Sequence, residues 1–290
     1  MNNTNIINFK IKCYNFISLY ISMKVLDNNK LTHVPLIQQN VDNLSDLPYR
    51  VADPLEAANS FSYIVGSAGS GKSSLFLALL CAHPTRKKPH EPRFYYRYFD
   101  RIYLCSNSLH SLPMDKLNLN DARVHSKFSN EILGSIIETE KEDVNNNTLL
   151  ILDDCIKQLK KGSDSLCQTI LNRRHILTNG DESGCAALSV WIMSQRYNEL
   201  PLTFRCNTSS IYLFRTDNSK ELQNIKDELM ADLNKEQQDE VLKIAWRDRY
   251  SFLLIRVNRP TNEKYYRRFD KIIVNENTED DKPSVSVEKD

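Results

Sequence analysis

The sequence predicts an α/β fold in which a mostly parallel sheet is flanked by helices. Short apolar runs of strand length recur along the chain, separated by helical segments or polar loops. Strands that alternate with helices are typical of parallel sheets, because a parallel connection must cross back over one face of the sheet. The runs that we expect to form core strands lie at 61–65, 101–106, 148–155, 187–195 and 209–215.

A glycine- and serine-rich segment follows the first of these runs, FSYIV, and an apolar helical run, LFLALLCA, follows that segment. The order strand, G-x-x-x-x-G-K-S, helix is that of a P-loop, or Walker A motif. Its small residues let backbone N–H groups curl around phosphate oxygens at a helix N-terminus. Lys72 is expected at the β and γ phosphates of ATP, and the Ser73 hydroxyl at Mg²⁺. The predicted nucleotide-binding residues are Gly66, Ser67, Ala68, Gly69, Ser70, Gly71, Lys72, Ser73 and Ser74.

Composition limits the other possibilities. The 290 residues carry 38 basic and 37 acidic side chains, a net charge of +1, so a nucleic-acid partner would have to be held by a local patch. The seven cysteines contain no C-x-x-C pair, which argues against a disulfide framework and a zinc site and favours a reducing compartment. No segment reaches the roughly 20 apolar residues of a membrane span, so we expect no membrane partner.

An acidic motif supports the prediction of a P-loop nucleotide site. The run TLLILDDC at 148–155 places Asp153 and Asp154 at the end of a buried strand. We assign Asp153 to the metal ion and Asp154 to the attacking water. The run RIYLCS at 101–106 intervenes, which predicts a strand between the P-loop strand and the aspartate strand. That arrangement is RecA-like, whereas nucleoside kinases keep those two strands adjacent. The run at 187–195 ends in Gln195, which could sense the γ-phosphate or orient water.

The remaining segments complete the expected domain organisation. Residues 1–22 could be an extra strand, an amphipathic arm or an upstream extension of a chain that starts at Met23, the last being favoured. Residues 23–60 are expected to be an irregular lead-in with a short strand near 34–37, and 61–218 a RecA-like core. The segment 219–274 is expected to form a small C-terminal extension, with helices at 219–233 and 235–246 and an edge hairpin from 251–257 and 268–274. A further helix is predicted at 129–142, with Ser129 or Asn130 as its N-cap. The acidic end, 275–290, is expected to be disordered.

These motifs, taken in order over about residues 60 to 274, resemble the genome-packaging ATPases of virophages and large DNA viruses, which belong to the FtsK/HerA group of DNA-pumping motors. The segments that carry the resemblance are GSAGSGKSS, LLILDD, RRHILTNG, WIMSQRYNELPLTFRCN, SFLLIRV and YYRRFDKI. The resemblance implies a homo-oligomeric ring that hydrolyses ATP to drive double-stranded DNA into a preformed capsid. It also implies capsid vertex proteins as partners, and a location at the viral assembly site in the host cytoplasm or in the virion.

Such a ring needs further residues. A neighbouring subunit supplies an arginine finger, for which Arg174 ranks before Arg205. Lys157, Lys160 and Lys161, just after the aspartate strand, are the expected pore-loop contacts to DNA phosphates. Many members of the wider group have Glu where this chain has Asp154. This departure keeps open a nucleotide-binding assembly switch with slow hydrolysis. A P-loop nucleotide kinase is the other alternative, against which the intervening strand, the paired aspartates and Gln195 all count.

Overall fold

The computed structural model describes residues 6–11, 19–24, 51–82, 94–112, 123–142, 146–157, 163–177, 186–274 and 285–288. The chain divides into two compact units, Met1–Asn40 and Val41–Asp290. In the first, β1 (Ile6–Ile11) pairs antiparallel with β2 (Leu19–Lys24). The predicted boundary at residue 22 therefore falls inside a strand. The strand expected near 34–37 lies outside the described residues.

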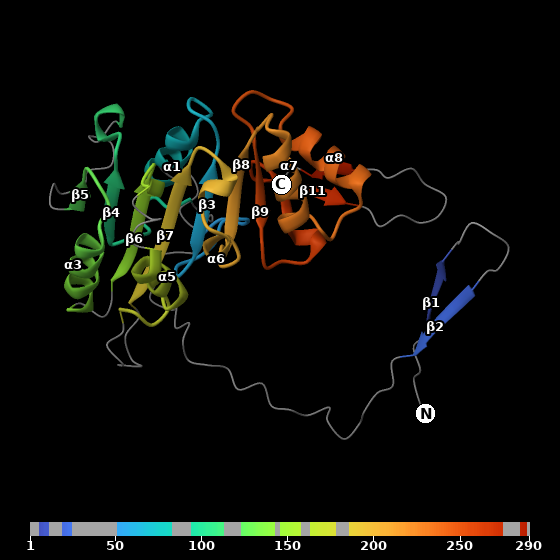
Figure 1. Ribbon diagram of the computed structural model, residues 1–290, viewed down its shortest axis with the longest axis horizontal. Helices are drawn as coiled ribbons and strands as arrows, with labels where there is room; N and C mark the ends of the chain where they lie inside the picture. The colour runs from blue at the N-terminus through green and yellow to red at the C-terminus, as the bar shows by residue number, and fades with distance from the viewer. Residues whose placement is uncertain are drawn as a thin grey trace, which may run out of the picture. The chain divides into compact units, whose positions relative to one another are not determined.

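The second unit is built on one sheet whose described strands run in the order β12-β11-β10-β9-β8-β3-β7-β6-β4-β5. Figure 1 shows these strands side by side, from β5 on the left to β11 on the right. The neighbouring strands β8, β3, β7, β6, β4 and β5 are parallel to one another. The strands β9, β10, β11 and β12 follow on the other side of β8, and each pairs antiparallel with its neighbour. The parallel strands are β3 (Phe61–Val65), β4 (Arg101–Ser106), β5 (Val124–His125), β6 (Asn147–Asp153), β7 (Ala187–Ser194) and β8 (Ser210–Phe214). The mostly parallel α/β fold is confirmed.

One detail of the predicted strand order is wrong. A strand does lie between the P-loop strand β3 and the aspartate strand β6, but it is β7 rather than Arg101–Ser106. That run is β4, which pairs with the far side of β6. The strand next in sequence is therefore not the strand next in space. This order brings the end of β7, with Gln195 after it, between the P-loop and the aspartates.

Helices cover both faces of the sheet, and side chains that alternate along each strand pack into two separate cores. One core lies under α3 (Asn130–Lys141), α5 (Ser163–Leu171), α6 (Leu202–Arg205), α7 (Ser219–Leu229) and α8 (Lys235–Ala245). The other lies under α1 (Lys72–Cys81) and residues 94–112, which include the short 3₁₀ helix η3 (Leu109–Ser111). Of the two residues expected to cap α3, Ser129 does so, because its Oγ accepts a hydrogen bond of 3.2 Å from the Ile132 N–H.

The segment 219–274 continues the main sheet instead of forming an appended extension. Its first strand, β9, pairs with the core strand β8 along its whole length, from Ser210 opposite Arg256 to Phe214 opposite Phe252. The predicted boundary at 218 therefore crosses a continuous sheet. Part of the expected disordered end, β12, pairs antiparallel with β11. The strands and 3₁₀ helices of this part are β9 (Phe252–Arg256), η6 (Thr261–Glu263), β10 (Tyr265–Arg267), β11 (Asp270–Val274) and β12 (Val285–Glu288).

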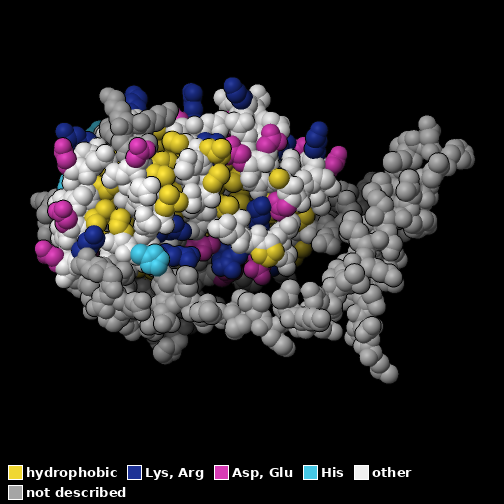
Figure 2. All heavy atoms as spheres, turned by 60° about the horizontal axis from the view of Figure 1, so that its bottom comes forward, with side chains coloured by type: hydrophobic (Ala, Val, Ile, Leu, Met, Phe, Trp, Pro, Cys, Tyr) yellow, Lys and Arg dark blue, Asp and Glu magenta, His cyan; other side chains and the backbone are white. Residues whose placement is uncertain are grey.

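The surface carries charges of both signs. On the face shown in Figure 2, Lys and Arg side chains are interspersed with Asp and Glu, in keeping with the net charge of +1. Among the described residues, the large apolar side chains that are exposed are Phe94, Leu171, Leu202 and Tyr250. Within the part of the chain that the structure describes, no helix is long and apolar enough to cross a bilayer.

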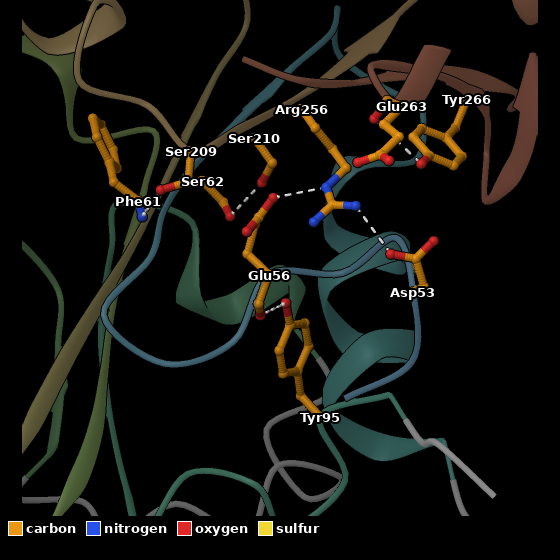
Figure 3. A network of polar contacts seen from close by, with 10 residues as sticks. All are labelled: Asp53, Glu56, Phe61, Ser62, Tyr95, Ser209, Ser210, Arg256, Glu263 and Tyr266. Atoms are coloured by element: carbon orange, nitrogen blue, oxygen red, sulfur yellow. Dashed lines mark hydrogen bonds and ion pairs between the residues drawn. The ribbon is translucent and has the colours of Figure 1, made fainter. Parts of the chain in front are cut away.

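A buried arginine fastens the lead-in to the sheet. Arg256, on β9, is 7% exposed and donates hydrogen bonds to Glu56 (2.9 Å) and Asp53 (3.0 Å), as Figure 3 shows. Tyr95 donates a 2.7 Å bond to the Glu56 carbonyl. Charge-assisted bonds are stronger than neutral ones when they are shielded from water, as the bond to Glu56 is. The segment that leads into the P-loop strand is therefore held by a strand made 200 residues later.

Candidate nucleotide-binding site

The phosphate loop begins where β3 ends. The Gly66 N–H donates to the Ser194 carbonyl at the end of β7 over 3.2 Å, so the loop starts against the neighbouring strand. Gly69 and Gly71 have φ angles of 74° and 111°, in the region where glycine has no steric cost. Helix α1 then begins at Lys72. Its unpaired N–H groups and its positive end make this turn an anion-binding site, as the sequence predicts.

Gly66 is required for another reason, which is space. A Cβ atom there would lie 2.5 Å from Ser70 Oγ and 2.7 Å from Cβ of Phe214, at the end of β8. Around Gly69, by contrast, a Cβ would meet nothing within 4 Å. Phe214 therefore fixes how closely the loop backbone lies against the sheet, and the loop can keep its shape only with glycine at position 66.

Lys72 turns back over the loop. Its ammonium group donates to the carbonyls of Gly66 (2.5 Å) and Ser67 (3.1 Å). Burial lowers the pKa of Lys72, while the carboxylates of Asp153 and Asp154 act in the opposite direction. The lysine and both aspartates are thus close enough to influence one another, which places the basic and acidic motifs in one site.

Asp153 is the last residue of β6 and is 6% exposed. The hydroxyl of Ser106, at the end of β4, donates a 2.9 Å hydrogen bond to its Oδ2. Burial raises the pKa of Asp153, and the bond from Ser106 partly offsets that effect. Ser106 orients the carboxylate from the neighbouring strand. The sequence reasoning missed it, because a serine at a strand end carries no signal by itself.

Asp154 and Gln195 meet, as expected for a pair acting on one water. Gln195 Nε2 donates to Asp154 Oδ2 over 3.4 Å. Asp154 has a φ of 54°, and its carbonyl accepts a 2.7 Å bond from the Asn107 amide. Between β3 and β7, Tyr63 OH and Ser194 Oγ lie 2.6 Å apart. This hydrogen bond ties the end of β7, which carries Gln195, to the P-loop strand. Tyr63 and Asn107 were not predicted.

The oxygen atoms at this edge suit Mg²⁺. The described residues contain no group of three or more His, Cys, Asp or Glu side chains that could hold a metal ion. Mg²⁺ does not need such a cage, since it is usually held by one or two protein oxygens together with substrate phosphates and water. The Ser73 hydroxyl at the start of α1 and the Asp153 carboxylate at the end of β6 are the groups of this kind that the sequence predicts.

The two predicted arginines have different surroundings. Arg205 lies with its side chain only 10% exposed and forms a forked pair with Glu228, at 2.7 and 2.9 Å. Its guanidinium also lies 4.8 Å from the centre of the Tyr197 ring. Arg174 is exposed, in the turn that follows α5. Arg205 is therefore engaged with Glu228 and Tyr197, and Arg174 is the more exposed of the two arginines.

The predicted DNA-binding lysines are only partly described. Lys157 is exposed and has helical backbone just after the aspartates. Lys160 and Lys161 lie outside the described residues. The position of Lys157, on the edge of the sheet that carries the site, is the one expected for a loop that follows β6.

A cleft of about 560 Å³ opens beside the phosphate loop. The start of α1 forms one wall, from Gly71 to Leu75, and three aromatic residues, Phe214, Tyr250 and Phe252, form the other. A second hollow of about 420 Å³ shares Gly69, Phe214 and Tyr250 with the first. The sequence analysis did not predict this wall, because its residues are single aromatics far along the chain from the P-loop.

Comparisons with known proteins identify the fold. No protein-family model and no curated protein matches the chain. Among solved structures, it is similar to the genome packaging NTPase B204 from Sulfolobus turreted icosahedral virus 2 in complex with ATP-gammaS. The two share 18% identity over 72% of this chain and 96% of that one, with a TM-score of 0.50. The DNA-packaging ATPase B204 from Sulfolobus turreted icosahedral virus gives 17% identity, 73% and 97% coverage, and a TM-score of 0.49. The first likeness shows a shared fold, that of a P-loop NTPase.

Proposed function

We propose that the chain is an ATP-hydrolysing double-stranded DNA translocase of the FtsK/HerA group, which packages a viral genome into a preformed capsid. The observation that carries the proposal is the meeting of the P-loop, Asp153, Asp154 and Gln195 at the ends of three adjacent strands, β3, β7 and β6. The fold shared with a genome packaging NTPase that was solved with ATP-gammaS supports it.

Each of these residues has its own role in ATP hydrolysis. The P-loop amides and Lys72 hold the phosphates and offset the negative charge that builds up on them. When bound through Ser73 and Asp153, Mg²⁺ would supply further charge neutralisation at those oxygens. Asp154 accepts a proton from water, and Gln195 orients that water toward the γ-phosphorus. A bond then forms from the water oxygen to phosphorus, and the bond to the β–γ bridging oxygen breaks, which yields ADP and phosphate.

Strand order favours this function over a nucleotide kinase. In nucleoside kinases the P-loop strand and the aspartate strand are generally adjacent, whereas here β7 lies between them and presents Gln195 to Asp154. A glutamine in contact with the proposed base suits activation of water better than transfer of phosphate to a bulky acceptor.

The DNA and ring parts of the proposal depend on charge and exposure. A packaging motor must accept every sequence, so its DNA contacts should be made to phosphates. Lys157, with Lys160 and Lys161 after it, is the proposed pore-loop contact, and a ring would multiply this small patch by its number of subunits. The exposed Arg174 is the proposed finger, and capsid vertex proteins in the host cytoplasm or the virion are the proposed further partners.

Steady-state ATP hydrolysis by the full chain, with and without long double-stranded DNA, tests the proposal. We expect DNA to raise the rate severalfold and this stimulation to fade as salt rises, because phosphate contacts release counterions. Lys72→Ala, which removes the phosphate-binding charge, should abolish turnover in both conditions. Turnover that is indifferent to DNA in a confirmed oligomer would refute the motor. Tight ATP binding without turnover would instead support the assembly switch.

A further inference from the structure

The strand order fixes the direction in which a bound nucleotide must lie. The γ-phosphate has to be near Asp153, Asp154 and Gln195, on the side of β3 where β7 and β6 lie. The other end of the nucleotide must therefore extend over the start of α1, away from the aspartates. That direction leads to β8 and β9, on the opposite side of β3. The cleft of about 560 Å³ between α1 and the aromatic wall lies there.

The aromatic wall has a single exposed member. Phe214 and Phe252 are each 4% exposed and belong to the core, whereas Tyr250 is 53% exposed. Tyr250 also has a φ of 63°, which is unfavourable for a bulky residue. A turn in which the Ser251 N–H donates to the Asp248 carbonyl over 3.1 Å holds this conformation. An exposed ring is thus kept beside the phosphate loop at a cost in backbone strain.

A positive charge lies over the ring. The guanidinium carbon of Arg249 is 4.8 Å from the centre of the Tyr250 ring, a cation–π distance. The ring edge reaches the loop itself, since a Cβ atom at Gly71 would lie 3.6 Å from Tyr250 Cδ1. Arg249 therefore orients the Tyr250 ring. The ring lies within reach of a ligand group that extends from the phosphate loop on this side.

We infer that Tyr250 is the stacking platform for the base of the bound nucleotide, in the cleft between α1 and the aromatic wall. The inference rests on the proposed function, because it assumes a nucleoside triphosphate on the P-loop. Stacking on an aromatic ring binds the flat apolar face of a purine without reading its hydrogen-bonding edge. The ligand class is therefore a phosphate compound that carries a planar ring able to lie against Tyr250.

Equilibrium binding of ATP and of inorganic tripolyphosphate to the full chain tests the inference. The second probe carries the phosphates without a base. For Tyr250→Ala we expect ATP binding to weaken about tenfold, the effect usual for a lost base–aromatic contact, with tripolyphosphate binding unchanged within twofold. Tyr250→Phe keeps the ring and should bind both probes as the wild type does. The exposure of Tyr250 makes misfolding of either variant unexpected, and thermal unfolding checks it.

The outcomes separate this inference from the proposed function. ATP binding by Tyr250→Ala that matches the wild type would overturn the stacking role, and so would an equal loss of ATP and tripolyphosphate. Wild-type binding of tripolyphosphate as tight as that of ATP would also overturn it, because the base would then add nothing. The motor fails instead when DNA leaves turnover unchanged, a result that does not involve Tyr250.

Discussion

The two sides of the P-loop strand β3 differ in chemistry. On the side of β7 and β6, the strand ends carry carboxylates, an amide and hydroxyls, among them Asp153, Asp154 and Gln195. On the side of β8 and β9, the residues at the same edge are Phe214, Tyr250 and Phe252. The first side offers groups that can accept protons and polarise water, and the second offers the faces of apolar rings. Under the proposed function, bond breaking and recognition of the base occupy opposite sides of β3, so mutations should separate the two.

The largest expected effect comes from the polar side. Asp154→Asn removes the proton acceptor but suits the local backbone, because asparagine tolerates the φ of 54° found there. We expect turnover to fall by about 10² to 10⁴, the usual contribution of a general base, while ATP binding stays within threefold. Single-turnover hydrolysis and equilibrium binding measure the two quantities. Turnover within threefold of the wild type would show that Asp154 is not the base.

A smaller effect should come from Gly66, the first residue of the phosphate loop after β3. Gly66→Ala would place a Cβ 2.7 Å from Phe214 Cβ, and overpacking of this kind costs about 1 to 3 kcal/mol. We expect ATP affinity to fall by about 10- to 100-fold, since the loop must shift away from its phosphate-binding shape. Gly69→Ala is the matched control, because it meets open space and costs only about 1 kcal/mol of backbone strain. Equal losses of affinity in the two variants, measured by titration, would contradict the steric explanation.

The smallest effect should come from the ion pair between Arg205 and Glu228. Burial tends to raise the pKa of Glu228, but hydrogen bonds from Arg205 and Tyr197 outweigh it and lower the pKa below its usual 4.5. A carboxyl with a lowered pKa stabilises the fold above its unfolded-state pKa, and this contribution is lost as the pH falls through the folded-state value. Glu228→Gln should therefore cost about 1 kcal/mol at neutral pH and less in acid.

Urea unfolding at pH 7 and near pH 3.5 measures this difference, with turnover at pH 7 as the second readout. We expect turnover to stay within twofold, because Arg205 belongs to the packing of α6 against α7. A loss of stability that is the same at both pH values would disprove the contribution of the Glu228 charge. A large loss of turnover would return Arg205 to the list of finger candidates.

Sequence reasoning succeeded where the signal was local. The P-loop, the aspartate strand and the Ser129 cap are each defined by residues a few positions apart, and the structure has all three. The order of strands depends on pairings between distant segments, which local periodicity does not encode. The sequence therefore placed Arg101–Ser106 beside the P-loop strand, where the structure has β7.

The missed site residues share one property. Ser106, Asn107 and Tyr250 act through partners that the fold brings to them from other strands or loops. A serine, an asparagine or a lone tyrosine is too common to stand out by itself. In the same way, the pairing of Arg205 with Glu228, across 23 residues, could not be read from either residue. Composition and motif spacing therefore predict the kind of site. Three-dimensional contacts decide which of several residues of the same type belongs to it.

The Arg256 bonds to Asp53 and Glu56 bear on how a growing polypeptide reaches this fold. They join positions 203 and 200 residues apart. The P-loop strand emerges from the ribosome early, yet its neighbours β7 and β8 are synthesised more than 100 residues later, and Arg256 later still. Pairings this distant form slowly and cannot begin before both partners exist. The nascent chain must therefore carry β3 without its partner strands until residues 187–214 have been made, and competence to hold a nucleotide is among the last properties that it acquires.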